Sequence, residues 1–133
     1  MADKHVYLDV RNYPTHDDGW TNTTASNNTT CSYKYSGGDD HAGGVTHLIG
    51  QGPAKITVNL IAAHQYQIAG ISFTGENVNE SQLSAQPKDG RAHEIHNKNS
   101  RELTAHYNVS VKDTLNNNVT IPCDPQIVNR QPT

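Results

Sequence analysis

The chain has 133 residues and a formal net charge of −3 at neutral pH, and this length suits one domain. The small net charge, with no cluster of Lys and Arg between aromatic residues, argues against nucleic acid as a partner. No apolar run is long enough to cross a membrane and no signal peptide is recognised, so we expect a cytoplasmic protein without a membrane partner. Two cysteines, Cys31 and Cys123, are expected to be buried free thiols rather than a disulfide.

Alternating apolar and polar residues, with turn signals between them, predict seven or eight short strands. In chain order, the expected strands are His5–Val10, Cys31–Ser36, Val45–Ile49, Lys55–Ile61, Gln67–Phe73, Arg91–His96, Arg101–Val111 and a last strand from Val119. A bulge is expected at Gly70–Ile71, where the alternation slips. Residues 11 to 30 are expected to form a loop, and 75 to 90 a polar connection with one helical turn near Ser81–Ala85. The sequence therefore predicts an all-β protein, an immunoglobulin-like antiparallel β-sandwich that spans residues 1–133 as one domain.

Two hairpins are predicted near the C-terminus. The first joins Arg91–His96 to Arg101–Val111 around residues 97 to 100. The second has its turn at Asp113–Asn118 and joins two apolar faces, formed by Leu103, Ala105, Tyr107, Val109 and Val111 on one strand and by Val119, Ile121, Cys123 and Ile127 on the other. Pairing apolar with apolar residues sets 111 opposite 119, 109 opposite 121 and 107 opposite 123. That register places Asp124 opposite His106, and a shift of two residues would offer Thr104 or Asn108 instead.

Asp124 is followed by Pro125, and an Asp–Pro bond is unusually labile for two chemical reasons. The carboxyl group can attack its own main-chain carbonyl and form a cyclic anhydride, and the proline nitrogen departs as a basic secondary amine. A second carboxylate could activate water, a histidine could protonate the leaving nitrogen, and a lysine could capture the anhydride. Alone, however, such a dipeptide is inert in most proteins, and two prolines on a terminal strand are typical of a protected sheet edge.

The chain resembles the DP-EP family of small bacterial proteins, named after Asp-Pro and Glu-Pro motifs. The resemblance rests on the segments Val6–Val10 and Ile68–Phe73 and above all on the ending Asp124-Pro125-Gln126-Ile127-Val128-Asn129. It implies an immunoglobulin-like β-sandwich that cleaves its own Asp-Pro bond, described as aspartic-type endopeptidase activity. Asp124 would then be the nucleophile and Pro125 the new N-terminus, while a loop aspartate, Asp39 or Asp40, would handle water. The chain has no Glu-Pro dipeptide and, in the register above, no lysine that faces Asp124.

Two functions follow as hypotheses. In the first, the protein is a self-cleaving enzyme: Asp124 attacks, Pro125 leaves, His106 serves as acid or orienting group, and Asp39 or Asp40 activates water. The released segment 125–133 could stay paired as a strand, and Lys98 or Lys112 could form a cross-link. In the second, the protein is a non-enzymatic module that binds protein or sugar, with an inert Asp–Pro bond. Neither hypothesis requires a cofactor. The expected partner is the chain itself, either as the substrate or as a second copy.

A weaker third hypothesis uses the loops to bind a metal or a carbohydrate. His41 and His47 flank a glycine-rich loop beside Asp39 and Asp40, although exposed loop histidines are the commoner situation and we expect no metal. An aromatic platform for sugars could be formed by Trp20, Tyr13, Tyr33 and Tyr35. Such residues more often cover the core of a sandwich.

Overall fold

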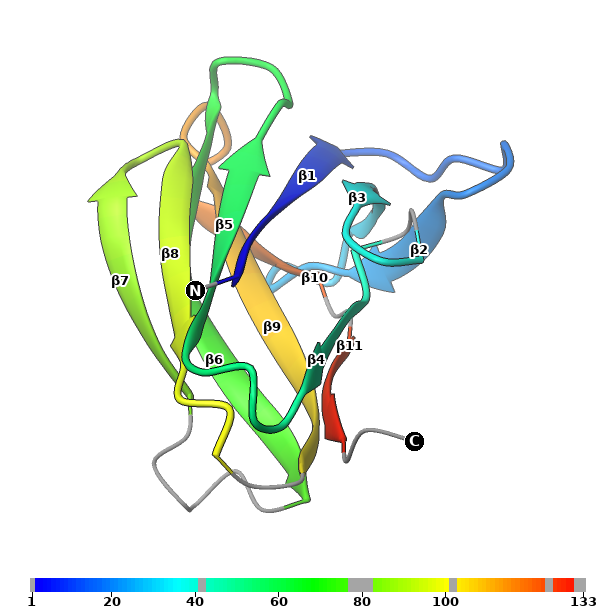
Figure 1. The fold of residues 1–133 in the computed structure, drawn as a ribbon. Helices are drawn as coiled ribbons and strands as arrows, with labels where there is room; N and C mark the ends of the chain where they lie inside the picture. Colours follow the sequence, from blue (N-terminus) through cyan, green and yellow to red (C-terminus); the bar gives the residue numbers. More distant parts are fainter. Residues whose placement is uncertain (1, 41–42, 77–82, 101–102, 124–125, 131–133) are drawn as a thin grey trace.

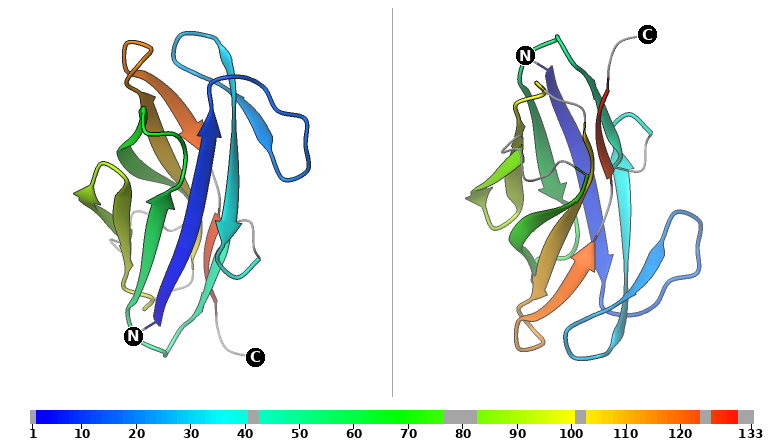
Figure 2. Two further views of the ribbon diagram at one scale, coloured as in Figure 1. Left: turned by 90° about the horizontal axis from the view of Figure 1, so that it is seen from above. Right: turned by 90° about the horizontal axis from the view of Figure 1, so that it is seen from below.

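A computed structural model describes residues 2–40, 43–76, 83–100, 103–123 and 126–130, and every regular element in these ranges is a β-strand. The strands form two sheets that pack against each other as a β-sandwich (Figure 1). The β1–β2 connection and the β2–β3 hairpin extend from one side of the sandwich (Figure 2). The predicted all-β sandwich is therefore confirmed, with eleven strands among the described residues instead of seven or eight.

The first sheet has six strands, and its centre is formed by β1 and β5. β1 pairs antiparallel with β3 and parallel with β5, so the N-terminal strand lies in the interior of the sheet. Across the sheet, the strands are β2 (Thr21–Thr24), β3 (Thr30–Gly37), β1 (Ala2–Arg11), β5 (Ala54–Leu60), β8 (Ala92–Asn97) and β7 (Leu83–Asp89).

The second sheet is built around the long strand β9 (Leu103–Asp113), which pairs along one side with β6 (Tyr66–Glu76). Along the other side, β9 pairs first with β10 (Val119–Cys123) and then with β11 (Gln126–Arg130). β4 (Val45–Leu48) runs parallel to β11 and completes the sheet.

Strict alternation along the central strands forms the core between the sheets. From Val6 to Val10 in β1 and from Ala105 to Val111 in β9, every second residue is apolar and buried, so that each of these stretches gives one face to the core. The fully buried positions include Val6, Leu8, Ile56, Val58, Ile95, Tyr107, Val109, Val111 and Ile121. Both cysteines are buried free thiols, as predicted.

Three predictions about individual elements were wrong. The predicted loop 11–30 contains β2, a polar strand with mostly exposed side chains that pairs with β3, and its sequence carries no alternation that would reveal it. Residues 83–89 form the strand β7 and not a helical turn, because they pair with β8 at the edge of the first sheet. The predicted hairpin between Arg91–His96 and Arg101–Val111 does not exist, since β8 and β9 belong to different sheets. The bulge predicted in β6 is confirmed, but the register shift lies between Ile68 and Gly70, just before the predicted position at Gly70–Ile71.

The predicted register of the last hairpin was wrong by two residues. Val119 lies opposite Asp113, Ile121 opposite Val111 and Cys123 opposite Val109. A shift of two residues keeps the same side chains on the same face, so alternation alone cannot distinguish the two registers. The turn decides between them, because the main-chain carbonyl of Asp113 accepts from the N–H groups of Asn116 and Asn118 and closes the hairpin at residue 113.

Candidate functional site

Asp124 and Pro125, the predicted nucleophile and leaving group, lie outside the described residues. The strands on either side of them, however, share one register against β9. Cys123, the last residue of β10, lies opposite Val109, and Gln126, the first residue of β11, lies opposite His106. Each strand advances by three residues between these two pairs, so the chain before and after the dipeptide is aligned on one neighbouring strand.

A buried tyrosine contacts the residue before Asp124. The Tyr35 hydroxyl donates a hydrogen bond of 3.1 Å to the main-chain carbonyl oxygen of Cys123. The ring of Tyr35 packs edge-on against that of Tyr107, with 6.0 Å between centroids. The Tyr107 hydroxyl in turn donates to the carbonyl of Gly43 at 2.6 Å. The two tyrosines therefore connect the residue before Asp124 with the glycine-rich segment between β3 and β4.

Glycines let this segment fold back tightly between the two sheets. Gly37, Gly38 and Gly43 have φ between +74° and +87°, a region that side chains with a Cβ rarely adopt. A Cβ atom on Gly43 would also meet the Tyr35 ring at 2.8 Å. The N–H of Asp39 donates to the carbonyl of Gly44 at 2.8 Å. The segment thus holds Gly43 against the two tyrosines and carries two neighbouring carboxylates, Asp39 and Asp40.

Asp39 acts as a structural tie between β1 and β4. Its carboxylate forms a 2.6 Å ion pair with Lys4 and accepts from the N–H of Thr46 at 2.7 Å. Partial burial works to raise the pKa of Asp39, but the hydrogen bonds from Lys4 and Thr46, with the positive charge of Lys4, outweigh it and lower the pKa. A carboxylate stabilised in this way is a poor base.

Asp40 is the loop carboxylate that lies on the side of the tyrosines. One of its oxygens accepts from the N–H of Gly44 at 2.8 Å. Burial raises the pKa of the Tyr107 hydroxyl, and the charge of nearby Asp40 raises it further. The Tyr107 phenol consequently stays protonated as a donor at neutral pH, with the Asp40 carboxylate close to it. Of the two predicted loop aspartates, Asp40 is the one whose charge acts on Tyr107.

His106 lies on the other face of the second sheet. Its neighbour Tyr107 is fully buried, whereas His106 is exposed, as alternation along β9 requires. Its positions in the two ladders are opposite Gln126 on β11 and Thr74 on β6, so the prediction that Asp124 lies opposite His106 was wrong. The structure therefore does not bring Asp40 and His106 together on one face.

The candidate cross-linking lysines are not grouped with these residues. Lys112 pairs with Thr120 on β10, four residues before Asp124 and about 13 Å along an extended chain. Lys98 is exposed and follows β8 of the first sheet. Sequence reasoning did not single out Lys4, but this lysine forms the ion pair with Asp39. Asp39 and Asp40 lie in the segment between β3 and β4, which we call the aspartate loop.

The residues suggested for loop binding sites are used in other ways. His41 lies outside the described residues, while His47 is buried with a ring nitrogen 2.7 Å from the Asn97 amide. The described residues contain no group of three or more His, Cys, Asp or Glu that could hold a metal ion. Tyr35 belongs to the core, and the Trp20 ring is covered by the Arg11 guanidinium at 4.0 Å, so the predicted aromatic platform is not assembled.

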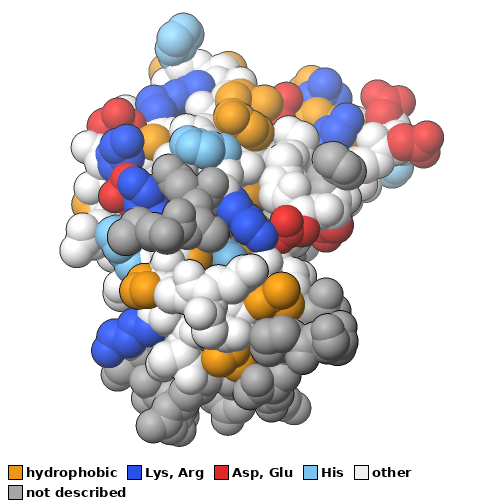
Figure 3. Space-filling view, viewed as in Figure 1, with side chains coloured by type: hydrophobic (Ala, Val, Ile, Leu, Met, Phe, Trp, Pro, Cys, Tyr) orange, Lys and Arg blue, Asp and Glu red, His pale blue; other side chains and the backbone are white. Residues whose placement is uncertain are grey.

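Neither the surface of the protein nor comparison with known proteins indicates a particular function. Described basic and acidic side chains are interspersed over the face seen in Figure 3, with no single large patch of one sign. The part of the chain that the structure describes contains no helix that could cross a membrane. The sequence matches no protein-family model and no curated protein. The two tyrosines are the site residues that sequence reasoning missed: alternation predicted that Tyr107 would be buried, but nothing in the pattern indicated its link to Tyr35.

Proposed function

We propose that this protein is a self-processing β-sandwich that hydrolyses its own Asp124–Pro125 bond. The observation that supports the proposal most directly is the hydrogen bond from Tyr35 to the Cys123 carbonyl, formed where β10 and β11 keep one register against β9. Intramolecular reactions gain most of their rate from restricted geometry. The chain is held at residue 123 by Tyr35 and pairs with β9 again from residue 126.

The reaction has two steps. The Asp124 carboxylate attacks its own main-chain carbonyl carbon, the bond to the Pro125 nitrogen breaks, and that nitrogen takes up a proton and leaves as a secondary amine. Water then adds to the cyclic anhydride, which restores the side-chain carboxyl of Asp124 and leaves its main-chain carbonyl as a new C-terminal carboxyl. Asp40 accepts the proton of the attacking water, and His106, from the outer face of the sheet, protonates the leaving nitrogen.

The products should remain associated after the cut. β11 pairs with both β9 and β4, so residues 127–129 are paired on both sides with strands that the cut does not touch. We therefore expect the nicked protein to purify as one species under native conditions and to separate into two chains only when it is unfolded.

Intact mass under denaturing conditions, followed over days at neutral pH, tests the proposal. Two fragments split at Asp124–Pro125 that sum to the chain plus one water support it. An N-terminal fragment lighter by one water would mean that a lysine had captured the anhydride. Asp124→Ala should abolish cleavage, Asp40→Asn should slow it, and Asp39→Asn serves as the matched control. A single unchanged mass for the unmodified chain would rule the proposal out.

The alternative is a non-enzymatic interaction module, and the edges of the first sheet support it. β2 and β7 are the outermost strands of that sheet, and most of their side chains are exposed. An added strand could pair with either edge. Pro87 and the register shift beside it make β7 the poorer template, so β2 would be the docking edge. An unchanged mass together with self-association in sedimentation would favour this function.

A further inference from the structure

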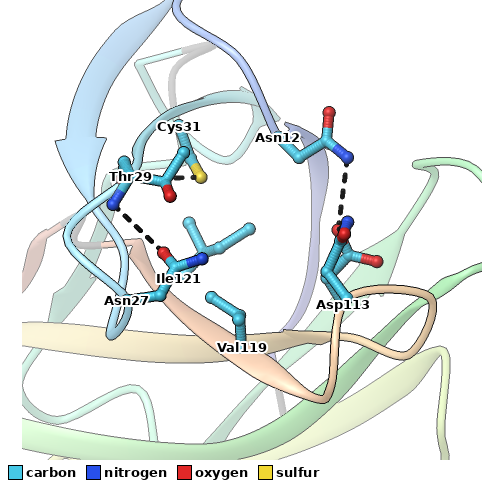
Figure 4. Close-up of a pocket in the computed structure, with 8 residues that line it drawn as sticks. Asn12, Asn27, Thr29, Cys31, Asp113, Val119 and Ile121 are labelled. Atoms are coloured by element: carbon cyan, nitrogen blue, oxygen red, sulfur yellow. Dashed lines mark hydrogen bonds between the residues drawn. The ribbon is translucent and has the colours of Figure 1, made fainter.

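A cavity of about 210 Å³ lies where β9 turns into β10, partly open to solvent (Figure 4). Its floor is apolar and consists of Cys31, Val119 and Ile121. Its rim is polar and includes Asn27 on one side and Asp113 on the other. The cleavage proposal uses none of these side chains, so the cavity needs an explanation of its own.

The Asp113 carboxylate is almost completely buried, with 1% of the residue exposed, and it accepts four hydrogen bonds from uncharged groups. It accepts from the side-chain amides of Asn116 at 2.6 Å and Gln65 at 2.9 Å and from the N–H of Leu115 at 3.2 Å. The fourth donor, the amide of the exposed Asn12, is 3.3 Å away. This is the weakest of the four contacts, and a ligand hydroxyl could replace it without loss to the carboxylate.

The negative charge of Asp113 affects the pKa values of neighbouring side chains. Burial, with the charge of Asp113, raises the pKa of Tyr66 to about 12, and the same two causes raise the pKa of the Cys31 thiol. Burial works to raise the pKa of Asp113, but the hydrogen bonds that it accepts outweigh burial and lower the pKa, so the carboxylate is ionised at neutral pH and favours ligands that donate hydrogen bonds. The Cys31 thiol in the floor stays protonated and behaves as an apolar surface.

Asn27 supplies a donor from the opposite side. Its side-chain oxygen accepts from the N–H of Thr29 at 3.1 Å, which fixes the amide so that its NH₂ group points toward the cavity (Figure 4). The cavity thus combines an acceptor on one side, a donor on the other and an apolar floor between them. A sugar ring has the matching chemistry, with hydroxyls that both donate and accept around a ring whose C–H face is apolar.

A second cavity of about 330 Å³ lies beyond Asn12, which lines both. Its lining includes Asp9, Gln65 and Tyr13, and the Tyr13 side chain is half-exposed. A tyrosine ring beside polar side chains offers an apolar surface for a second sugar ring and hydrogen-bond partners for its hydroxyls. The two cavities together offer room for more than one ring.

We propose that this end of the sandwich binds a short neutral saccharide, with one ring on the floor of Val119 and Ile121 and its hydroxyls bonded to Asp113 and Asn27. The site is independent of self-cleavage and does not require it. The proposed ligand is an uncharged polyhydroxyl compound, and binding of a cationic ligand by Asp113 alone would contradict the proposal.

The test is an NMR titration of the ¹⁵N-labelled full chain with glucose, galactose, mannose, N-acetylglucosamine and cellobiose, and separately with ethylammonium. We expect saturable shifts of the Asn12 and Asn27 side-chain amides with at least one sugar. Asn27→Ala should weaken that binding about tenfold, the effect of losing one good hydrogen bond. Val119→Phe should abolish binding by filling the cavity. Thr120→Ala, on the outer face of the same strand, is the matched control and should bind normally.

A second measurement on the unmodified chain does not depend on the folding of any variant. The bound sugar should slow the reaction of Cys31 with methyl methanethiosulfonate, because the thiol lies in the floor of the cavity. No shift with any of the five sugars overturns the proposal, as do shifts with ethylammonium alone. Sugar binding by Asn27→Ala and Val119→Phe that is as strong as binding by the unmodified chain also overturns the proposal. So does a bound sugar that leaves the reaction rate of Cys31 unchanged.

Discussion

The Tyr35 hydroxyl and the Cys123 carbonyl oxygen, 88 residues apart in the chain, are joined by a buried hydrogen bond of 3.1 Å. Tyr35 lies on β3 of the first sheet and Cys123 ends β10 of the second, so the bond spans the core of the sandwich. Because the same peptide unit leads into Asp124, the contact links the packing of the two sheets to the chemistry proposed for the next bond.

Replacing Tyr35 with Phe should affect both stability and cleavage. The variant leaves a buried carbonyl without its donor, so the free energy of unfolding should fall by about 1–2 kcal/mol. Cleavage should slow severalfold because residue 123 is less firmly held. Urea unfolding and intact mass over time measure the two effects. Tyr7→Phe, at a position 39% exposed, is the control and should change neither. A loss of stability with an unchanged cleavage rate would mean that Tyr35 stabilises the fold but does not assist cleavage.

The tie between Lys4 and Asp39 should make stability depend on pH at the acidic end. The folded-state pKa of Asp39 is lowered from 3.8, so its contribution is fully present above that value and is lost as pH falls through the lower, folded-state pKa. Asp39→Asn should cost about 0.5–1 kcal/mol at neutral pH, since the pair is partly exposed. The difference from the unmodified protein should shrink in unfolding experiments below pH 3.8.

The matched control for that experiment is Asp18→Asn, an exposed position in the β1–β2 connection. It should show no comparable pH-dependent difference. A difference for Asp39→Asn that stays constant down to strongly acidic pH would mean that the ion pair is not the cause.

Gly43→Ala should disturb the aspartate loop through a specific clash. The residue has φ +87°, and an added Cβ would come within 2.8 Å of the Tyr35 ring. Strained backbone and the clash together should lower the free energy of unfolding by about 2–3 kcal/mol. Gly50→Ala is the control, because Gly50 has φ +101° but no atom within 4 Å of the added carbon. Equal losses in denaturant unfolding would show that the contact with Tyr35 contributes nothing.

Alternation predicted the strands whose two faces have different surroundings. β1, β5 and β9 each bury one face, so their apolar residues recur at every second position. β2 and β7 escaped prediction because both are edge strands with mostly exposed side chains, which leaves no pattern to read. The local sequence also does not show which sheet a strand joins, and for this reason the predicted pairing of β8 with β9 was wrong.

The candidate site was predicted only in part, for a related reason. The motif at Asp124 and the adjacent acids Asp39 and Asp40 are recognisable as residue types in a row. The link from Tyr35 to Cys123 depends on how two sheets face each other, which no spacing along the chain encodes. His106 was placed opposite Asp124 only because a register shifted by two residues satisfies the same apolar pattern.

Asp113, whose carboxylate holds the β9–β10 turn, gives the last prediction. Asp113→Ala leaves the amides of Gln65 and Asn116 and the N–H of Leu115 without their acceptor. The free energy of unfolding should fall by about 3 kcal/mol, because hydrogen bonds to a buried charge are among the strongest. Asp113→Asn keeps one oxygen acceptor and should cost less.

The pH dependence of the Asp113→Ala effect separates these hydrogen bonds from simple packing. Partial burial works to raise the pKa of Asp113, but the hydrogen bonds it accepts outweigh burial and lower the folded-state pKa below 3.8. A lowered folded-state pKa means that the stabilisation is complete above 3.8 and is lost as pH falls through the folded-state value. The gap between the unmodified protein and Asp113→Ala in urea unfolding should therefore narrow in strong acid. A gap that does not narrow would mean that the carboxylate contributes through its shape and not its charge.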